Sequence, residues 1–188
     1  MSETGLQYRA RRSRTREMVT AALLAALLAA SAWISIPVGA VPVTLQVFVV
    51  LLAGLLLTPR GALAAVGVYL LLGAAGLPVF AGGLGGAGVL AGPTGGYLWG
   101  FALGATAVAW LGERGARRMP ATAARILALT AGVSLIYLAG WLQLAAVTGM
   151  GPWPAFAVGV APFLLIDVGK AAVALGVARA LARAGFAR

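Results

Sequence analysis

Charged side chains are almost missing from three long stretches of this chain, and that absence constrains its fold more than any other feature. Residues 18–59 and 61–112 carry no charge over 42 and 52 positions, and the 53 residues of 126–178 carry only Asp167 and Lys170. An α-helix needs about 20 apolar residues to cross the hydrocarbon core of a bilayer. Each stretch is therefore long enough for two crossings joined by a turn, which indicates a membrane protein.

The composition supports this interpretation. The chain is 62% apolar and 10% charged, with a mean hydropathy of +1.00, whereas soluble domains are about 45–50% apolar and about 25% charged. The net charge of +10 comes from short basic clusters between the apolar runs, so we do not expect a nucleic-acid partner. Cysteine and histidine are both absent, which excludes disulfides, thiolate nucleophiles, histidine acid–base chemistry and the usual zinc ligands.

The pattern predicts an all-α integral membrane protein with six transmembrane helices. Prolines mark the expected turns between helices, where a helix must stop. The second and third helices are short, which suits segments that are covered by protein over part of their length. The predicted helices lie near 18–36, 43–58, 61–77, 94–112, 124–148 and 155–182.

The arginines predict the orientation of these helices. All thirteen stand before the first helix, between the second and third, between the fourth and fifth, or in and after the end of the sixth (Arg9, Arg11, Arg12, Arg14, Arg16, Arg60, Arg114, Arg117, Arg118, Arg125, Arg179, Arg183 and Arg188). The other three loops carry no charge (37–42, 78–93 and 149–154). Because cytoplasmic loops of membrane proteins carry an excess of lysine and arginine, the arginine-bearing segments and both termini are expected in the cytoplasm. The chain then divides into a basic segment at 1–17, a transmembrane domain at 18–183 and a tail at 184–188.

A signal peptide is the rival interpretation of the N-terminus. Arginines precede residues 18–36, and Ala30, Ser31 and Ala32 would suit a signal peptidase. The apolar run is longer than the 7–15 residues typical of a signal core. We therefore expect a retained helix; cleavage would leave five helices and an external N-terminus.

Glycine is concentrated between residues 73 and 100, where eleven occur. Residues 83–88 match GxGxxG, but the strand, helix and acidic residue of a dinucleotide site are missing around them. The run is interpreted either as a loop that folds closely over a ligand at the outer mouth or as a flexible connector. Farther on, Gly92, Gly96, Gly100 and Gly104 recur every four residues, which favours close packing of one helix face against a neighbour.

Asp167 and Lys170 are the strongest functional signal. They stand three residues apart, on one face of the last predicted helix, and each charge at mid-bilayer costs about 3 kcal/mol on insertion scales. The functional interpretation is a polar ligand site, and the structural alternative is an ion pair that fixes the helix in the bundle. Pro162 suggests that the helix begins or kinks just before the pair. Thr44 and Gln46 offer uncharged hydrogen-bonding groups just inside the outer end of the second predicted helix.

With these residues in view, the sequence resembles the BioY family, the biotin-specific S components of energy-coupling factor (ECF) vitamin transporters. The most specific matches are the Gly-Pro-Thr-Gly-Gly-Tyr run and the Asp-x-x-Lys pair. The matching stretches lie at 41–46, 59–61, 69–83, 92–98 and 162–170. Two departures are Leu165 and Ile166, where family members often have proline and glycine, and Thr58, where glycine commonly precedes Pro-Arg.

The resemblance implies a six-helix S component that binds biotin and has no cofactor, no ATPase and no enzymatic activity of its own. It implies a ligand site made of Asp167, Lys170, Gln46, Thr44, Tyr97 and Thr94. It also implies partners: a transmembrane coupling protein, contacted through small residues of the first helix (Ala22, Ala26 and Ala30), and two cytoplasmic ATPases. The departures at Leu165 and Ile166 predict a more regular helix entering Asp167.

Three other functions stay open at the level of sequence. An S component for another vitamin would have the same fold. A membrane-embedded enzyme would have to use Lys170 as its base or nucleophile. A pore would need polar positions repeated along several helices, and only scattered Thr, Ser and Gln are available.

Overall fold

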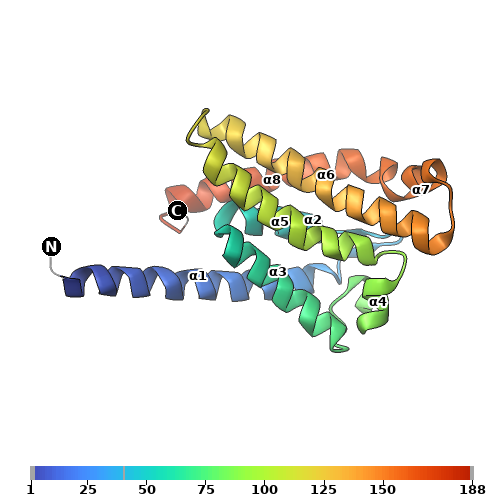
Figure 1. Cartoon of the computed structure of the whole chain (residues 1–188), viewed down its shortest axis with the longest axis horizontal. Helices are drawn as coiled ribbons and strands as arrows, with labels where there is room; N and C mark the ends of the chain where they lie inside the picture. Colours follow the sequence, from blue (N-terminus) through green and yellow to red (C-terminus); the bar gives the residue numbers. More distant parts are fainter. Residues whose placement is uncertain (1–2, 40, 187–188) are drawn as a thin grey trace.

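A computed structural model describes the backbone of residues 3–39 and 41–186, and the side chains of residues 14–39 and 41–186. The chain folds into a bundle of helices with one short hairpin (Figure 1). The elements are α1 (Glu3–Ser31), β1 (Ser35–Ile36), β2 (Val43–Thr44), α2 (Gln46–Leu56), α3 (Pro59–Ala74), η1 (Ala81–Gly83), α4 (Ala87–Ala91), α5 (Gly95–Gly115), α6 (Ala121–Thr148), α7 (Pro152–Gly159), η2 (Ala161–Phe163) and α8 (Leu164–Arg183).

The six predicted helices correspond to α1, α2, α3, α5, α6 and the segment from α7 to α8, with shifts at their ends. The largest shift is in α1, which begins at Glu3 and not near residue 18. Helix α2 begins only at Gln46 because Val43 and Thr44 pair with β1 instead. Ser35 pairs with Thr44 in this antiparallel hairpin, so the prediction of a purely helical chain missed two short strands. Within the described residues, only 121–148 and 152–183 are both long and apolar enough to cross a membrane by length and composition. The six crossings therefore stay a prediction.

The last predicted helix, 155–182, is broken near Pro162. It consists of α7, the short turn η2 and then α8, which begins at Leu164. Proline lacks an N–H and its ring clashes with the preceding turn, so the break occurs where the sequence indicated it. Its consequence is that Asp167 lies in the first turn of α8, on regular helical backbone.

Glycines allow α5 and α6 to pack closely against each other. A Cβ on Gly96 would lie 2.2 Å from the carbonyl oxygen of Ala139, and one on Gly100 would lie 2.8 Å from Cα of Ile136. Gly104 meets α6 in the same way. The predicted packing role is confirmed for these three, whereas Gly92 ends α4 and does not belong to α5.

The glycine-rich connection between α3 and α5 has a defined course. It includes η1 and α4, and Gly82 and Gly86 adopt positive φ angles of 72° and 100° that other residues rarely adopt. The Gly86 N–H donates to the carbonyl of Gly73 at 2.7 Å, and the ring of Phe80 packs directly on Gly73. The segment 78–93 thus covers one end of the bundle.

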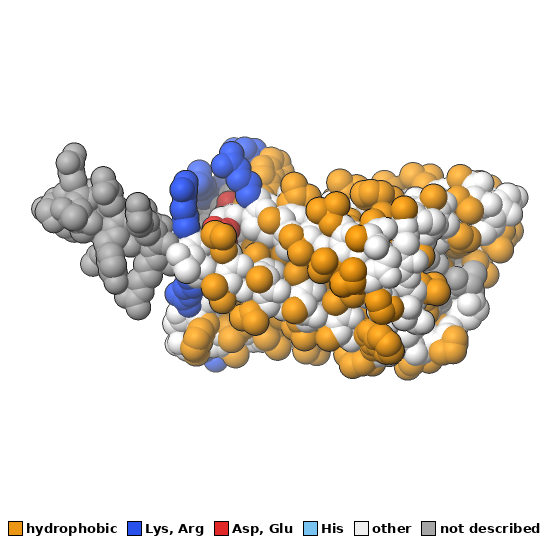
Figure 2. All heavy atoms as spheres, turned by 90° about the horizontal axis from the view of Figure 1, so that it is seen from below, with side chains coloured by type: hydrophobic (Ala, Val, Ile, Leu, Met, Phe, Trp, Pro, Cys, Tyr) orange, Lys and Arg blue, Asp and Glu red, His pale blue; other side chains and the backbone are white. Residues whose placement is uncertain are grey.

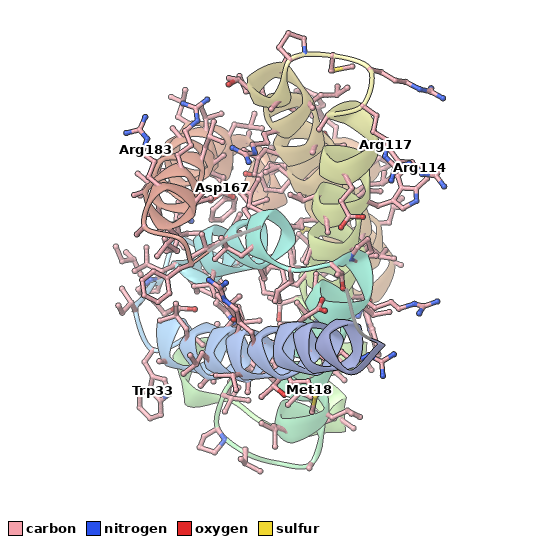
Figure 3. The ribbon with its side chains drawn as sticks, turned by 90° about the vertical axis from the view of Figure 1, so that its left-hand side faces the viewer. Met18, Trp33, Arg114, Arg117, Asp167 and Arg183 are labelled. Carbon is pink, nitrogen blue, oxygen red and sulfur yellow. The ribbon has the colours of Figure 1, made fainter. Side chains whose placement is uncertain are left out.

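Basic side chains gather at the opposite end of the molecule, which we call the arginine end. Figure 2 shows blue and red side chains together there, and apolar side chains over the rest of the same face. The C-termini of α5 and α8 reach this end with Arg114 and Arg183, as Figure 3 shows. The N-termini of α2, α5 and α8 therefore lie at the far end.

Candidate functional site

A cavity of about 220 Å³ lies at the end of the bundle away from the arginines. The hairpin, segment 78–93 and helices α2, α5, α6 and α8 all contribute to its wall. All six residues of the predicted ligand site line it: Thr44, Gln46, Thr94, Tyr97, Asp167 and Lys170. Most of the remaining wall is apolar, including Val41, Val47, Phe80, Leu98, Phe101, Ile136 and Phe163.

Asp167 and Lys170 form an ion pair at this wall. The Lys170 ammonium donates to Oδ1 of Asp167 at 2.6 Å, and the two side chains are only 11% and 3% exposed. The helix N-terminus also favours the carboxylate, because the first-turn N–H groups carry partial positive charge. Since each charge offsets the other, the pair is retained in an apolar surrounding.

Tyr137 completes this site, and no pattern in the sequence pointed to it. Its hydroxyl donates to Oδ2 of Asp167 at 2.6 Å, so each carboxylate oxygen accepts one hydrogen bond. Tyr137 belongs to α6 and Asp167 to α8, and Asp167 points from its helix toward α6 (Figure 3). Only the fold brings these two residues, 30 positions apart, together.

Thr44 and Gln46 form a second polar group in the wall of the cavity. The Thr44 hydroxyl donates to Oε1 of Gln46 at 3.2 Å, and Nε2 of Gln46 donates to the hydroxyl of Tyr69 at 2.5 Å. Gln46 is 2% exposed. Tyr69, on α3, is a further residue that sequence reasoning missed; it fixes the Gln46 amide from behind the cavity.

Tyr97 and Thr94 contribute in different ways. The Tyr97 hydroxyl donates to the carbonyl of Gly159 at 2.7 Å, so the ring forms cavity wall while the polar tip secures α7. Thr94 precedes the first residue of α5, and its side chain makes no capping hydrogen bond there. Its hydroxyl is therefore not engaged by that helix end.

Gln143 holds the covering segment in place. Its Nε2 donates to the carbonyl oxygens of Leu90 and Gly92, each at 2.8 Å. Because segment 78–93 supplies Phe80, Ala81, Leu84 and Val89 to the cavity wall, this contact from α6 fixes one side of the enclosure. The loop-over-the-mouth interpretation of the glycine-rich run therefore fits the structure better than a flexible connector does.

The three alanines predicted for partner coupling lie elsewhere. Ala22, Ala26 and Ala30 are exposed along one face of α1, away from the cavity, whereas Ala25 and Leu28 of the same helix are buried in the bundle. One face of α1 thus packs inside the bundle, and the face with these three alanines points outward.

The chemistry of the cavity suits a small, partly apolar molecule with both hydrogen-bond donors and acceptors. One carboxylate, one ammonium, a hydroxyl and an amide group line the same, largely apolar cavity. Within the part of the chain that the structure describes, no three acidic, histidine or cysteine side chains lie close enough to hold a metal ion.

Comparisons with known proteins agree with the resemblance seen in the sequence. Residues 4–186 match the family model described as the BioY family. The chain is 44% identical over 168 residues to a probable biotin transporter BioY of Pyrococcus horikoshii, covering 89% of this chain and 97% of that protein. It is 43% identical over 159 residues to the biotin transporter BioY of Thermotoga maritima, covering 85% and 91%.

A solved structure has the same fold. The crystal structure of the S-component for biotin from an ECF-type ABC transporter superposes with a TM-score of 0.83 at 25% identity, covering 92% of this chain and 93% of that one. The fold is therefore that of an S component. From the family match, the related sequences and the shared fold together, the chain belongs to the BioY family.

Proposed function

We propose that this chain is the biotin-binding subunit of a vitamin uptake system and holds biotin in the cavity at the hairpin end. The observation that carries the proposal is the Asp167–Lys170 ion pair, little exposed, which lines one cavity together with Thr44 and Gln46. The names of the relatives supply the ligand.

The pair can exchange its internal contact for contacts with the ligand. Each Asp167 oxygen accepts one bond, from Lys170 or Tyr137, and a carboxylate oxygen has a second lone pair. Asp167 therefore has capacity for the ureido N–H groups of biotin. Lys170 has two further N–H donors for the ureido carbonyl or the carboxylate, and the apolar wall covers the sulfur ring and the side chain.

Biotin binding to the purified chain tests this assignment. Asp167→Asn and Lys170→Ala are each expected to weaken binding by about 10- to 100-fold, since hydrogen bonds to charged groups contribute about 1.5–3 kcal/mol. Unlabelled vitamins other than biotin should compete poorly; effective competition by one of them would favour the second candidate, an S component for that vitamin.

Controls separate loss of binding from loss of folding. Removing one member of a buried ion pair is destabilising, whereas removing both charges is tolerated better, so Asp167→Asn/Lys170→Met should fold and still fail to bind. Glu113→Gln removes a carboxylate outside the cavity and should bind like the parent chain. Parental affinity in both single variants would refute the site.

The proposal includes the membrane topology. The chain crosses the cytoplasmic membrane of a bacterium six times, with both termini, the basic segment 1–17 and the tail 184–188 in the cytoplasm and the cavity facing outward. The gathering of basic side chains at one end supports this orientation through the positive-inside rule.

Energy for uptake comes from partners: a transmembrane coupling protein and two cytoplasmic ATPases. The exposed ridge of Ala22, Ala26 and Ala30 supports contact between α1 and a helix of the coupling protein, because small residues allow backbones to approach closely. Ala26→Trp should therefore abolish uptake in cells while biotin binding is kept. Leu138→Trp, at an exposed position of α6, is the matched control, and equal uptake by the two variants would exclude this ridge as the contact.

A further inference from the structure

A second hollow lies on the outside of the bundle, in a groove between α6 and α8. Its volume is about 430 Å³. Several lining side chains are exposed on the molecular surface; Val168, for example, is 67% exposed, so the groove is open along its side. Its wall is mainly apolar and is formed by residues within 126–137 of α6 and within 164–175 of α8.

The length of this groove matches one leaflet of a bilayer. On α8 its lining runs from Leu164 to Leu175, which is about 17 Å at 1.5 Å per residue. Half of a hydrocarbon core about 30 Å thick is about 15 Å. An acyl chain reaching to the bilayer midplane therefore fits the groove from end to end.

Two arginines stand where the groove meets the arginine end. Arg179 and Arg183 follow Leu175 at four-residue steps and so continue the face of α8 that lines the groove. Arg179 also donates to the hydroxyl of Thr122 on α6 at 3.0 Å, which spans the gap between the two helices. Among the lining residues the structure describes, the only acid is Asp167, at the far end. Guanidinium groups bind phosphate through paired, charge-assisted hydrogen bonds.

We propose that the α6–α8 groove binds an anionic phospholipid of the leaflet on the arginine side. Arg179 and Arg183 hold its phosphate, as basic pockets between transmembrane helices do for acidic headgroups, and one acyl chain lies along the groove. The end of that chain meets Tyr137 and Asp167, which line both the groove and the ligand cavity. The lipid thus supports the outer side of the wall that carries the ion pair.

Native mass spectrometry of the purified full chain tests the site, using palmitoyl-oleoyl-phosphatidylglycerol and palmitoyl-oleoyl-phosphatidylcholine as paired probes. The parent chain is expected to retain phosphatidylglycerol preferentially. Arg179→Gln/Arg183→Gln should reduce that preference by about thirty-fold, the effect of two arginines at about 1 kcal/mol each. Ala172→Trp fills the groove and should remove the adduct of either lipid.

Matched variants make each outcome decisive. Arg114→Gln/Arg117→Gln removes the same charge at the same end but away from Arg183 (Figure 3), and Val173→Trp adds the same ring at an exposed neighbour that does not line the groove. Both should bind lipid like the parent, and thermal unfolding verifies that all variants fold. Equal retention of the two lipids, equal losses in test and control pairs, or a dimer of the chain that Ala172→Trp dissociates would each overturn the proposal.

Discussion

At the scale of single residues, the cavity depends on how one carboxylate is held. Asp167 receives one bond along its own helix from Lys170 and one across the bundle from Tyr137. The first neutralises its charge and the second fixes its orientation, because a phenol on α6 and an ammonium on α8 approach different oxygens. A buried charge held from two sides has little freedom to turn away from a ligand.

Tyr137→Phe tests the contribution of the bond across the bundle. The substitution keeps the ring and removes one donor from a buried carboxylate, so we expect a loss of about 1.5–3 kcal/mol in the free energy of unfolding. Unfolding of the purified chain in detergent measures it. Thr130→Val, which removes an exposed hydroxyl bonded within α6, should change stability by less than about 0.5 kcal/mol; equal effects of the two variants would contradict this role of Tyr137.

The residues of the site were predictable to different degrees. A charge in an apolar stretch is costly wherever it lies, so Asp167 and Lys170 could be identified from sequence before any contact was known. Tyr137 and Tyr69 are amphipathic residues that suit many places in a membrane helix. Their roles depend on partners 30 and 23 positions away, and no local pattern encodes such a distance.

At the scale of elements, the glycine-lined interface between α5 and α6, here called the seam, positions the cavity wall. Tyr97 on α5 packs so closely on Gly140 of α6 that a Cβ there would lie 2.3 Å from the ring. The same helix pair carries Tyr137 and Gln143, which contact Asp167 and the covering segment. Close backbone approach along the glycines therefore sets the spacing between these side chains.

Gly96→Ala and Gly112→Ala should have opposite effects on stability, although both glycines belong to α5. The methyl group at Gly96 meets the Ala139 carbonyl at 2.2 Å, so forcing the helices apart should cost about 1–3 kcal/mol. No side chain and no other helix lies within 4 Å of a Cβ placed at Gly112, so alanine there should stabilise the helix by about 0.5–1 kcal/mol. Thermal unfolding of both variants measures the difference; destabilisation by both would contradict a specific role of the seam.

The elements that could not be predicted are short. Proline has a definite effect on a helix, so the break at Pro162 was expected. Two residues such as Val43 and Thr44 fit a strand or the start of a helix equally well, because the spacing of apolar residues that distinguishes the two cannot be recognised over two positions. The same holds for α4, five residues within a glycine-rich run.

At the scale of the whole molecule, charge and binding capacity lie at opposite ends. The cavity is enclosed by the hairpin and segment 78–93, and the basic side chains gather where α5 and α8 end. In the proposed orientation, which the positive-inside rule favours, the basic end lies in the cytoplasm. On that proposal a ligand from outside reaches the cavity without crossing the bundle, and the ridge of Ala22, Ala26 and Ala30 on α1 is left for the proposed partners within the membrane.

Single cysteines report this orientation directly, because the chain has none of its own. Val38→Cys lies beside the hairpin and Ala116→Cys in the connection between α5 and α6, both at exposed positions. In intact cells a membrane-impermeant maleimide should label Val38→Cys, and it should label Ala116→Cys only after the membrane is permeabilised. Biotin binding by both variants verifies that they fold. The reverse pattern would invert the orientation, and labelling of both in intact cells would mean that the positions share one side, which six crossings do not allow.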